Sequence, residues 1–177
     1  MQEKNAEKTE LIAKGLYPHE KWELLENGIF IAKSRMPRSA EQINVLDKEL
    51  EQARILVSRG STVFLLPESD QPKIKKKKYP DAVVDGYVTE FKTITGGIRQ
   101  VERRYKKAKE KNPACIFMLI DADLKPDNVK WKLSGYIKRK GLADNSIILA
   151  YFTKSDEFHE WSEDELVAGG NTAAKSR

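Results

Sequence analysis

The chain has 177 residues, of which 40% are hydrophobic and 33% charged, and its formal net charge is +5. This length is sufficient for one compact domain with a real core, and the composition is that of a globular protein. The longest apolar runs, such as CIFMLI, are too short to span a bilayer, and the N-terminus lacks the apolar core of a signal peptide. We therefore expect a cytoplasmic protein that has no membrane partner.

Cysteine and histidine are scarce. The single cysteine, Cys115, lies inside CIFMLI and is expected to pack as a small buried hydrophobe. The two histidines, His19 and His159, are far apart in sequence, and the chain has no CxxC motif. A preformed structural zinc site is therefore not expected.

The first 38 residues are expected to form a frayed or helical leader, over residues 1–18, and a small appendage. The appendage is predicted from WELLENGIFIAK, residues 22–33, in which Asn27-Gly28 separates two strand-like runs. An Asn-Gly pair in this setting is the strongest short signal of a β-hairpin.

A helix is predicted over residues 40–59. Ser39 and Gln42 form a capping box at its start. Apolar residues then recur at helical spacing up to Gly60, namely Ile43, Leu46, Leu50, Ala53 and Val57. STVFLL follows as a predicted strand that ends at Pro67, and a lysine-rich loop comes after it.

The second half of the chain continues to alternate between strands and helices. Two strands are expected on either side of Asp85-Gly86, and a helix is expected after Gly96-Gly97. ACIFMLID is predicted to be a buried strand, VKWKLSGYIKRK a helix capped by Asp127 or Asn128, and SIILAYF the last strand. The order helix, three strands, helix, strand, helix, strand predicts an α/β fold with a small mixed sheet. Residues 162–177 are expected to form a flexible tail.

Positive charge is concentrated in one part of the chain. Residues 73–140 hold 19 Lys and Arg against 8 Asp and Glu, whereas the other residues hold 13 against 19. A polyanion is the natural partner of such a segment, because each neutralised phosphate releases condensed counterions. The alternative is a solvated basic face that has no partner.

An acidic pair lies inside this basic segment, in PDAVVDGYVTEFK, residues 80–92. If Asp85-Gly86 forms a two-residue turn, Asp81 faces Glu90 across the hairpin, and like charges in such positions repel each other. Lys92 shares their face, because residues two apart on a strand point the same way. A divalent cation between the carboxylates would remove the repulsion, since Mg²⁺ takes oxygen ligands. A cross-strand charge cluster neutralised by Lys92 is the structural alternative.

A third acid comes from the predicted helix over residues 40–59. Glu49 lies on or beside its apolar stripe, whereas Glu51 is expected to be more exposed. A carboxylate directed toward the sheet needs a partner, which a metal or Lys92 could supply, and a surface ion pair is the alternative. Glu68 is a weaker candidate, because a loop residue after Pro67 is the simpler interpretation.

These residues resemble the signature of the PD-(D/E)xK nuclease superfamily, which is Pro-Asp followed across a hairpin by an acid, any residue and Lys. Pro80-Asp81 and Glu90-Phe91-Lys92 carry the resemblance, and the matching pattern extends over residues 40–152. Within that superfamily, the chain is most similar to the C-terminal toxin domains of contact-dependent growth inhibition systems and to related phage-borne domains. Many of those domains are metal-dependent nucleases that cut tRNA.

The resemblance implies a restriction-endonuclease-like core within residues 39–161, flanked by a helix and by the N-terminal β-hairpin. It also implies that Asp81 and Glu90 are catalytic metal ligands together with the carbonyl of Phe91. Lys92 would be the catalytic lysine, and Glu49 the auxiliary acid of the same catalytic and metal site.

We therefore expect a metal-dependent nuclease that uses Mg²⁺ or Mn²⁺ in preference to Zn²⁺. Its expected partners are nucleic acid, tRNA in particular, and a cognate inhibitor or immunity protein. The residues expected to contact the nucleic acid are Lys75, Lys76, Lys77, Lys78, Arg99, Gln100, Arg103 and Lys107. Trp131 and Tyr136 could stack on bases, although core packing is the stronger expectation for Tyr136.

Three other functions remain open from the sequence. A DNA endonuclease of restriction, repair or mobile-element type would use the same residues. A nucleic-acid-binding module on the same fold would lack catalysis, but such a module has no use for repelling carboxylates beside phosphate. An interaction protein would carry the acidic cluster by chance. Metal titration separates the last two from an enzyme.

Overall fold

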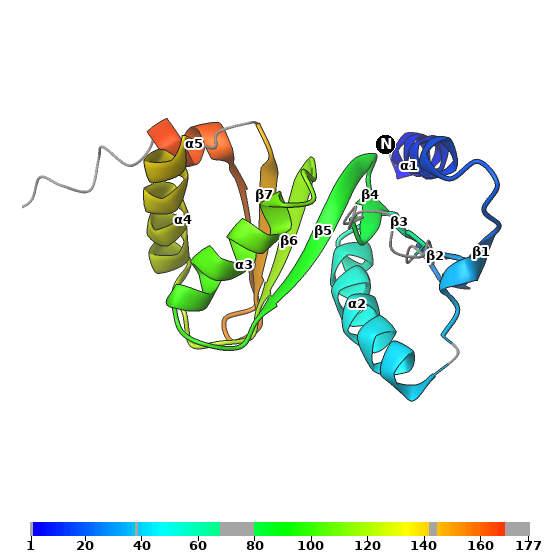
Figure 1. Cartoon of the computed structure of the whole chain (residues 1–177), viewed down its shortest axis with the longest axis horizontal. Coiled ribbons are helices and arrows are strands. Elements are labelled where there is room, and N and C mark those ends of the chain that lie inside the picture. Colours follow the sequence, from blue (N-terminus) through cyan, green and yellow to red (C-terminus); the bar gives the residue numbers. More distant parts are fainter. Residues whose placement is uncertain (1, 38, 68–79, 142–144, 169–177) are drawn as a thin grey trace, which may run out of the picture. The chain divides into compact units, whose positions relative to one another are not determined.

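The computed structural model describes residues 2–37, 39–67, 80–141 and 145–168. The chain divides into two compact units, residues 1–91 and residues 92–177 (Figure 1). The elements of the first unit are α1 (Gln2–Leu16), β1 (Trp22–Glu26), β2 (Ile29–Ala32), the 3₁₀ helix η1 (Lys33–Arg35), α2 (Ala40–Ser58), β3 (Val63–Leu65), β4 (Ala82–Val84) and the start of β5 (Tyr87–Ile94). Strand β5 continues into the second unit, which begins at Lys92.

The strands of the first unit lie in the order in which they follow one another along the chain. β1 and β2 form the antiparallel hairpin predicted from Asn27-Gly28, and Gly28 has the positive φ of 77° that such a turn requires. β2 pairs in parallel with β3, so that Phe30 lies opposite Phe64. The hairpin, which was expected to be an appendage, is therefore bonded directly to the strands of the predicted core.

Helix α1 covers part of these strands. Its Ala13 is wholly buried and packs in a cluster with Phe64, Leu66 and Val83. The ring of Phe30 stacks on Phe64 at 4.5 Å between centroids and extends this cluster. The predicted leader is thus a packed helix, held by the ordinary burial of apolar side chains.

Helix α2 begins as predicted. Ser39 is its N-cap, and the Ser39 hydroxyl accepts a hydrogen bond from the amide of Gln42 at 3.3 Å. Leu46, Leu50, Ala53 and Leu56 are buried. Two of the predicted stripe positions differ, because Ile43 is 46% exposed and Val57 is only half-buried.

The second unit has α3 (Arg99–Lys109), β6 (Cys115–Ile120), α4 (Pro126–Lys140), β7 (Ile147–Phe152), β8 (Glu157–Ser162) and α5 (Glu163–Ala168). β6 pairs in parallel with β7, and β8 pairs antiparallel to β7. Every residue of β6 is buried, including the free Cys115, as expected of a continuous apolar run in a parallel pair. Helices α3 and α4 enclose this core with Val101, Tyr105, Leu133 and Ile137.

The predicted α/β class is confirmed, and so is the order α2, β3, β4, β5, α3, β6, α4, β7. Helix α4 begins one residue before the predicted cap, because Pro126 occupies its first turn and Lys125 is the N-cap. The sequence interpretation missed β8 and α5. Glu163 and Leu166 of α5 are buried, so residues 163–168 of the predicted tail form a packed helix. None of the helices in the described part of the chain has the length and apolar composition needed to cross a membrane.

Candidate functional site

The β4–β5 hairpin has the register predicted from its sequence. The observed pairs are Val84 with Tyr87, Val83 with Val88, and Ala82 with Thr89. The turn residues Asp85 and Gly86 have φ values of 48° and 85°, as a two-residue primed turn requires. The Asp85 carboxylate also accepts a hydrogen bond from the amide of Thr62 at 3.0 Å, which ties the turn to the residue before β3.

Asp81 lies one residue beyond the end of this ladder and is half-buried. Its amide donates to the carbonyl of Thr89 at 3.1 Å, and its Oδ2 accepts from the amide of Phe91 at 2.8 Å. The carboxylate is therefore turned against the backbone of β5. A carboxylate offers about four lone-pair positions, so it can accept from more than one partner at a time.

Glu90 lies on β5 and is completely buried, with 0% of its surface exposed. A buried carboxylate is costly unless hydrogen bonds, an opposite charge or a metal compensates it, which makes Glu90 the most constrained acid of the hairpin. Lys92 is the second residue after Glu90 on the same strand and is partly exposed.

The strand directions explain why distant residues meet beside Asp81. β2 and β3 are parallel, so their C-terminal ends lie at one edge of the sheet, and the antiparallel β4 begins at that edge. Arg35 follows β2, Leu66 follows β3, and Asp81 precedes β4. The guanidinium Nη1 of Arg35 donates to the carbonyls of Leu66 and of Asp81, the latter at 2.8 Å.

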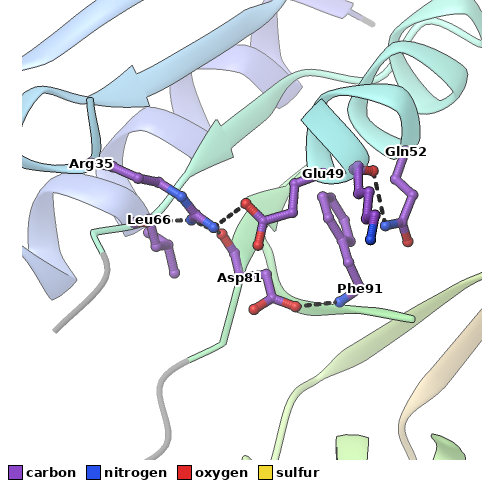
Figure 2. A network of polar contacts seen from close by, with 7 residues as sticks. Arg35, Glu49, Gln52, Leu66, Asp81 and Phe91 are labelled. Carbon is purple, nitrogen blue, oxygen red and sulfur yellow. Dashed lines mark hydrogen bonds and ion pairs between the residues drawn. The ribbon is translucent and has the colours of Figure 1, made fainter. Parts of the chain in front are cut away.

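Helix α2 brings Glu49 to the same guanidinium. The side chain of Glu49 is 13% exposed, and its Oε2 forms an ion pair with Nη2 of Arg35, whose side chain is 4% exposed. Figure 2 shows Arg35 between Leu66 and Glu49, with the carboxylate of Asp81 directed toward the amide of Phe91. One arginine thus links the helix-borne acid to the start of the acidic hairpin.

Sequence reasoning missed two polar residues at this edge. Arg35 falls in a segment that was expected to be an appendage, and no local pattern marks it. Gln52 is 3% exposed and lies one turn after Glu49 on α2, where its Nε2 donates to the carbonyl of Lys48 at 3.2 Å. Its Oε1 is buried and has no hydrogen-bond donor among the described residues. The sequence did carry a signal for Gln52, because this polar residue lies among the apolar positions of α2.

The donor set decides which metals these residues suit. Within the part of the chain that the structure describes, no three His, Cys, Asp or Glu side chains converge as a metal-binding group. Zn²⁺ sites need three or four such protein ligands. Mg²⁺ is commonly held by one or two carboxylates and completes its shell with waters and substrate phosphates. Asp81 and Glu90 offer carboxylate oxygens, which are the ligand type that Mg²⁺ takes.

The basic helix α3 carries the predicted nucleic-acid contacts of the second unit. Arg99, Arg103 and Lys107 are exposed. Gly96, Gly97, Ile98, Arg99, Gln100 and Arg103 line an open hollow of about 590 Å³. Gln100 has a structural role as well, because its Oε1 accepts from the amides of Thr95 at 3.0 Å and Gly96 at 2.7 Å. The four predicted lysines of residues 75–78, and Glu68, lie outside the described residues.

Part of the positive charge around α3 is already compensated. Glu102 pairs with Lys132 at 2.7 Å and with Arg139 at 3.3 Å. The hydrogen bond from Lys132 and the charges of both cations hold the pKa of the Glu102 carboxyl below its usual range. Tyr136 is buried and packs edge-to-face against Tyr105, so its expected core position is confirmed, whereas Trp131 is 71% exposed.

If α3 binds nucleic acid, replacing Arg103 by glutamine should weaken that binding equally for different sequences. A residue that contacts phosphate contributes affinity without reading bases. The slope of log affinity against log salt should become shallower by about one. Fluorescence anisotropy across a salt series measures both quantities. Lys154→Gln is the matched control, because it removes one exposed charge from the same unit at a distance in sequence from α3. Equal slopes for the two variants would contradict a role of α3 in binding.

The hairpin and the basic helix fall within one segment that is similar to a known family. Residues 77–153 match the family described as the contact-dependent growth inhibition CdiA C-terminal domain. No curated protein and no solved structure matches the chain. The matched segment includes Asp81, Glu90, Lys92 and α3, whereas Arg35 and Glu49 lie outside it. The comparison supports the predicted resemblance to toxin domains of these systems and leaves the PD-(D/E)xK superfamily a prediction.

Proposed function

We propose that the protein is a metal-dependent nuclease with a toxin-like role, which hydrolyses phosphodiester bonds in RNA and in tRNA in particular. The observation that carries the proposal is the acidic hairpin, in which Glu90 is wholly buried and the carboxylate of Asp81 accepts the amide of Phe91. The match of residues 77–153 to a toxin domain supports the proposal, because the hairpin lies within the matched segment. The choice of tRNA rests on the resemblance alone.

The carboxylates of Asp81 and Glu90, with the carbonyl of Phe91, would hold the metal ion. Bound there, Mg²⁺ or Mn²⁺ supplies charge stabilisation at the scissile phosphate and a more acidic water. Lys92, two residues after Glu90, would hold or move the proton of the attacking water or stabilise charge on the phosphate. Glu49 would act beside Asp81 as the auxiliary acid, and its contact with Arg35 restrains its position.

Substrate binding would rely on α3. Arg99 and Arg103 line the hollow at the start of this helix and would contact the phosphate backbone. Such contacts position a strand without reading its sequence. The exposed indole of Trp131 on α4 offers a stacking surface for an unpaired base. We propose a cognate immunity protein as the second partner. The nucleic acid that the toxin cuts would lie in the cytoplasm.

The direct test is cleavage of total tRNA and of single- and double-stranded DNA by wild type and by Asp81→Asn. With Mg²⁺ or Mn²⁺ we expect tRNA to be cut, and chelation should stop the reaction. Asp81→Asn keeps an acceptor for the Phe91 amide but loses the charge, so its rate should fall by about 10²- to 10³-fold. Asp85→Asn is the matched control on the same hairpin, because asparagine tolerates the positive φ of that turn.

The outcomes distinguish the competing functions. Preferential cutting of DNA would replace the ribonuclease with a DNA endonuclease. Salt-dependent binding of nucleic acid without cleavage would favour a non-catalytic binding module. A variant Lys92→Ala that binds Mn²⁺ like wild type but no longer cleaves would support the role of Lys92 in the chemical step rather than in metal binding.

A further inference from the structure

Arg35 is a buried cation whose guanidinium contacts three chain segments of the first unit. Its side chain is 4% exposed, and it bonds to the carboxylate of Glu49 and to the carbonyls of Leu66 and Asp81. Burial of a charge is unfavourable unless an opposite charge and hydrogen bonds compensate it. Glu49 supplies the opposite charge, and the two carbonyls accept further hydrogen bonds. Glu49 therefore neutralises the charge of Arg35, and the hydrogen bonds to the two carbonyls hold the Arg35 side chain in one orientation.

The two carbonyls that Arg35 binds belong to the ends of neighbouring strands. Leu66 directly follows β3, and Asp81 directly precedes β4. The amide of Leu66 also donates to the carbonyl of Asp81 at 3.0 Å, so the same oxygen accepts from the backbone and from Arg35. The link fixes the peptide group that Asp81 contributes to the start of the hairpin.

Asp81 is consequently held on both sides of its Cα atom and at its side chain. Its amide donates to Thr89, its carbonyl accepts from Arg35, and its carboxylate accepts from the amide of Phe91. With the backbone fixed at both peptide groups, the side chain has few remaining ways to turn. A metal ligand gains affinity and correct orientation from such surrounding hydrogen bonds.

Arginine suits this position for a geometric reason. The guanidinium is planar and presents several N–H donors in a fixed fork, so one group can serve a carboxylate and two carbonyls at once. A lysine ammonium is a compact point charge with three donors on a flexible stem. It could retain the ion pair with Glu49 but is not shaped to hold all three acceptors in the same arrangement.

We propose that Arg35 is a positioning residue of the candidate site, which fixes the orientation of Asp81 and of Glu49 through one guanidinium. The inference rests on the proposed function, in which Asp81 and Glu49 belong to the nuclease site. It deepens that function by assigning a role to a residue of the N-terminal segment, outside the part that matches the toxin family. Arg35 contacts neither the scissile phosphate nor the metal in this role.

The test compares Arg35→Lys with wild type in the full chain. The first readout is hydrogen exchange of the Phe91 amide, followed by NMR, because this amide donates to the Asp81 carboxylate. We expect exchange to become about tenfold faster or more once Asp81 is released. The second readout is calorimetric titration with Mn²⁺, for which the dissociation constant is expected to rise by about 10- to 100-fold.

Arg54→Lys is the matched control. Arg54 lies on α2, its side chain is exposed, and it pairs bidentately with Glu26, a residue outside the proposed site. The control should leave both the Phe91 exchange rate and the Mn²⁺ affinity within about twofold of wild type, because exposed ion pairs contribute little. If Arg35→Lys also leaves both readouts unchanged, or lowers only the thermal stability, the proposal is overturned.

A second variant guards against failure of Arg35→Lys to fold. Glu49→Gln keeps an acceptor for Arg35 but leaves the buried guanidinium without its opposite charge, and should accelerate Phe91 exchange in the same direction. Asp47→Asn, on the exposed side of the same helix, is its control. An unchanged Phe91 rate in Glu49→Gln contradicts the proposal.

The two proposals fail in distinguishable ways. If wild type neither binds Mn²⁺ nor cleaves nucleic acid, the nuclease function is wrong, and the Phe91 amide alone then decides the role of Arg35. Faster exchange in Arg35→Lys would still establish that Arg35 holds Asp81. Normal exchange would remove that role as well.

Discussion

Replacing Glu90 by glutamine is expected to abolish metal-dependent cleavage while the chain remains folded. Glutamine has nearly the same shape as glutamate, so the fully buried site on β5 can accommodate it without a cavity. The substitution removes the negative charge that would hold a divalent cation near the phosphate. Loss of one such preorganised electrostatic group lowers the rate by about 10²- to 10³-fold. We expect loss of a metal ligand to lower the rate by at least the upper value of this range. Single-turnover cleavage at saturating Mg²⁺ measures the effect.

The control for this substitution is Glu160→Gln, an equally conservative change at an exposed position on strand β8. Thermal unfolding of both variants shows whether lost activity reflects lost structure. Excess Mn²⁺ gives a further check, because a weakened metal site can be partly restored by mass action, whereas a misfolded one cannot. Cleavage by Glu90→Gln at the wild-type rate would leave the burial of this carboxylate without a catalytic explanation.

The local parts of the fold could be predicted because short segments determine them. The Asp85-Gly86 turn fixes the hairpin register, since a two-residue loop permits only one pairing of the strands that it joins. The Ser39 cap likewise determines where α2 begins. Strand β8 was missed because its sequence, EFHEWS, contains two glutamates and a histidine and lacks a strong strand pattern. Its pairing with β7 depends on tertiary contacts rather than on local propensity.

The candidate site could be predicted only where it is local in sequence. Asp81 and Glu90 lie on the two sides of a tight hairpin, so the turn and the register of its ladder could be predicted from the sequence. Arg35 and Asp81 are 46 positions apart, and they meet because β2 pairs in parallel with β3 at the edge where β4 begins. No periodicity within the N-terminal segment encodes that pairing. A buried arginine at a sheet edge is therefore a result that only the three-dimensional structure supplies.

The second large effect is expected at α5, where Glu163→Gln should destabilise the second unit. Glu163 is completely buried, and its Oε1 lies 3.1 Å from the Nζ atom of Lys109, whose side chain is 9% exposed. Tyr105 donates its hydroxyl to the same carboxylate oxygen, and Lys109 also donates to the hydroxyl of Ser146 at 2.9 Å. Removing the carboxylate charge leaves the Lys109 ammonium buried without this counter-charge. Breaking a buried pair from one side typically costs about 3–5 kcal/mol.

Urea unfolding followed by circular dichroism measures this loss, and two further variants interpret it. Asp164→Asn, an exposed position of the same short helix, should change the free energy of unfolding by less than about 0.5 kcal/mol. The double variant Glu163→Gln with Lys109→Met removes both charges, so it should lose less stability than the sum of the single variants. If Glu163→Gln unfolds at the wild-type urea concentration, α5 does not depend on this pair, and its apolar contact through Leu166 must hold it instead. A large loss would show that residues 163–168, which resemble a polar tail in sequence, are an integral part of the unit that carries the basic helix.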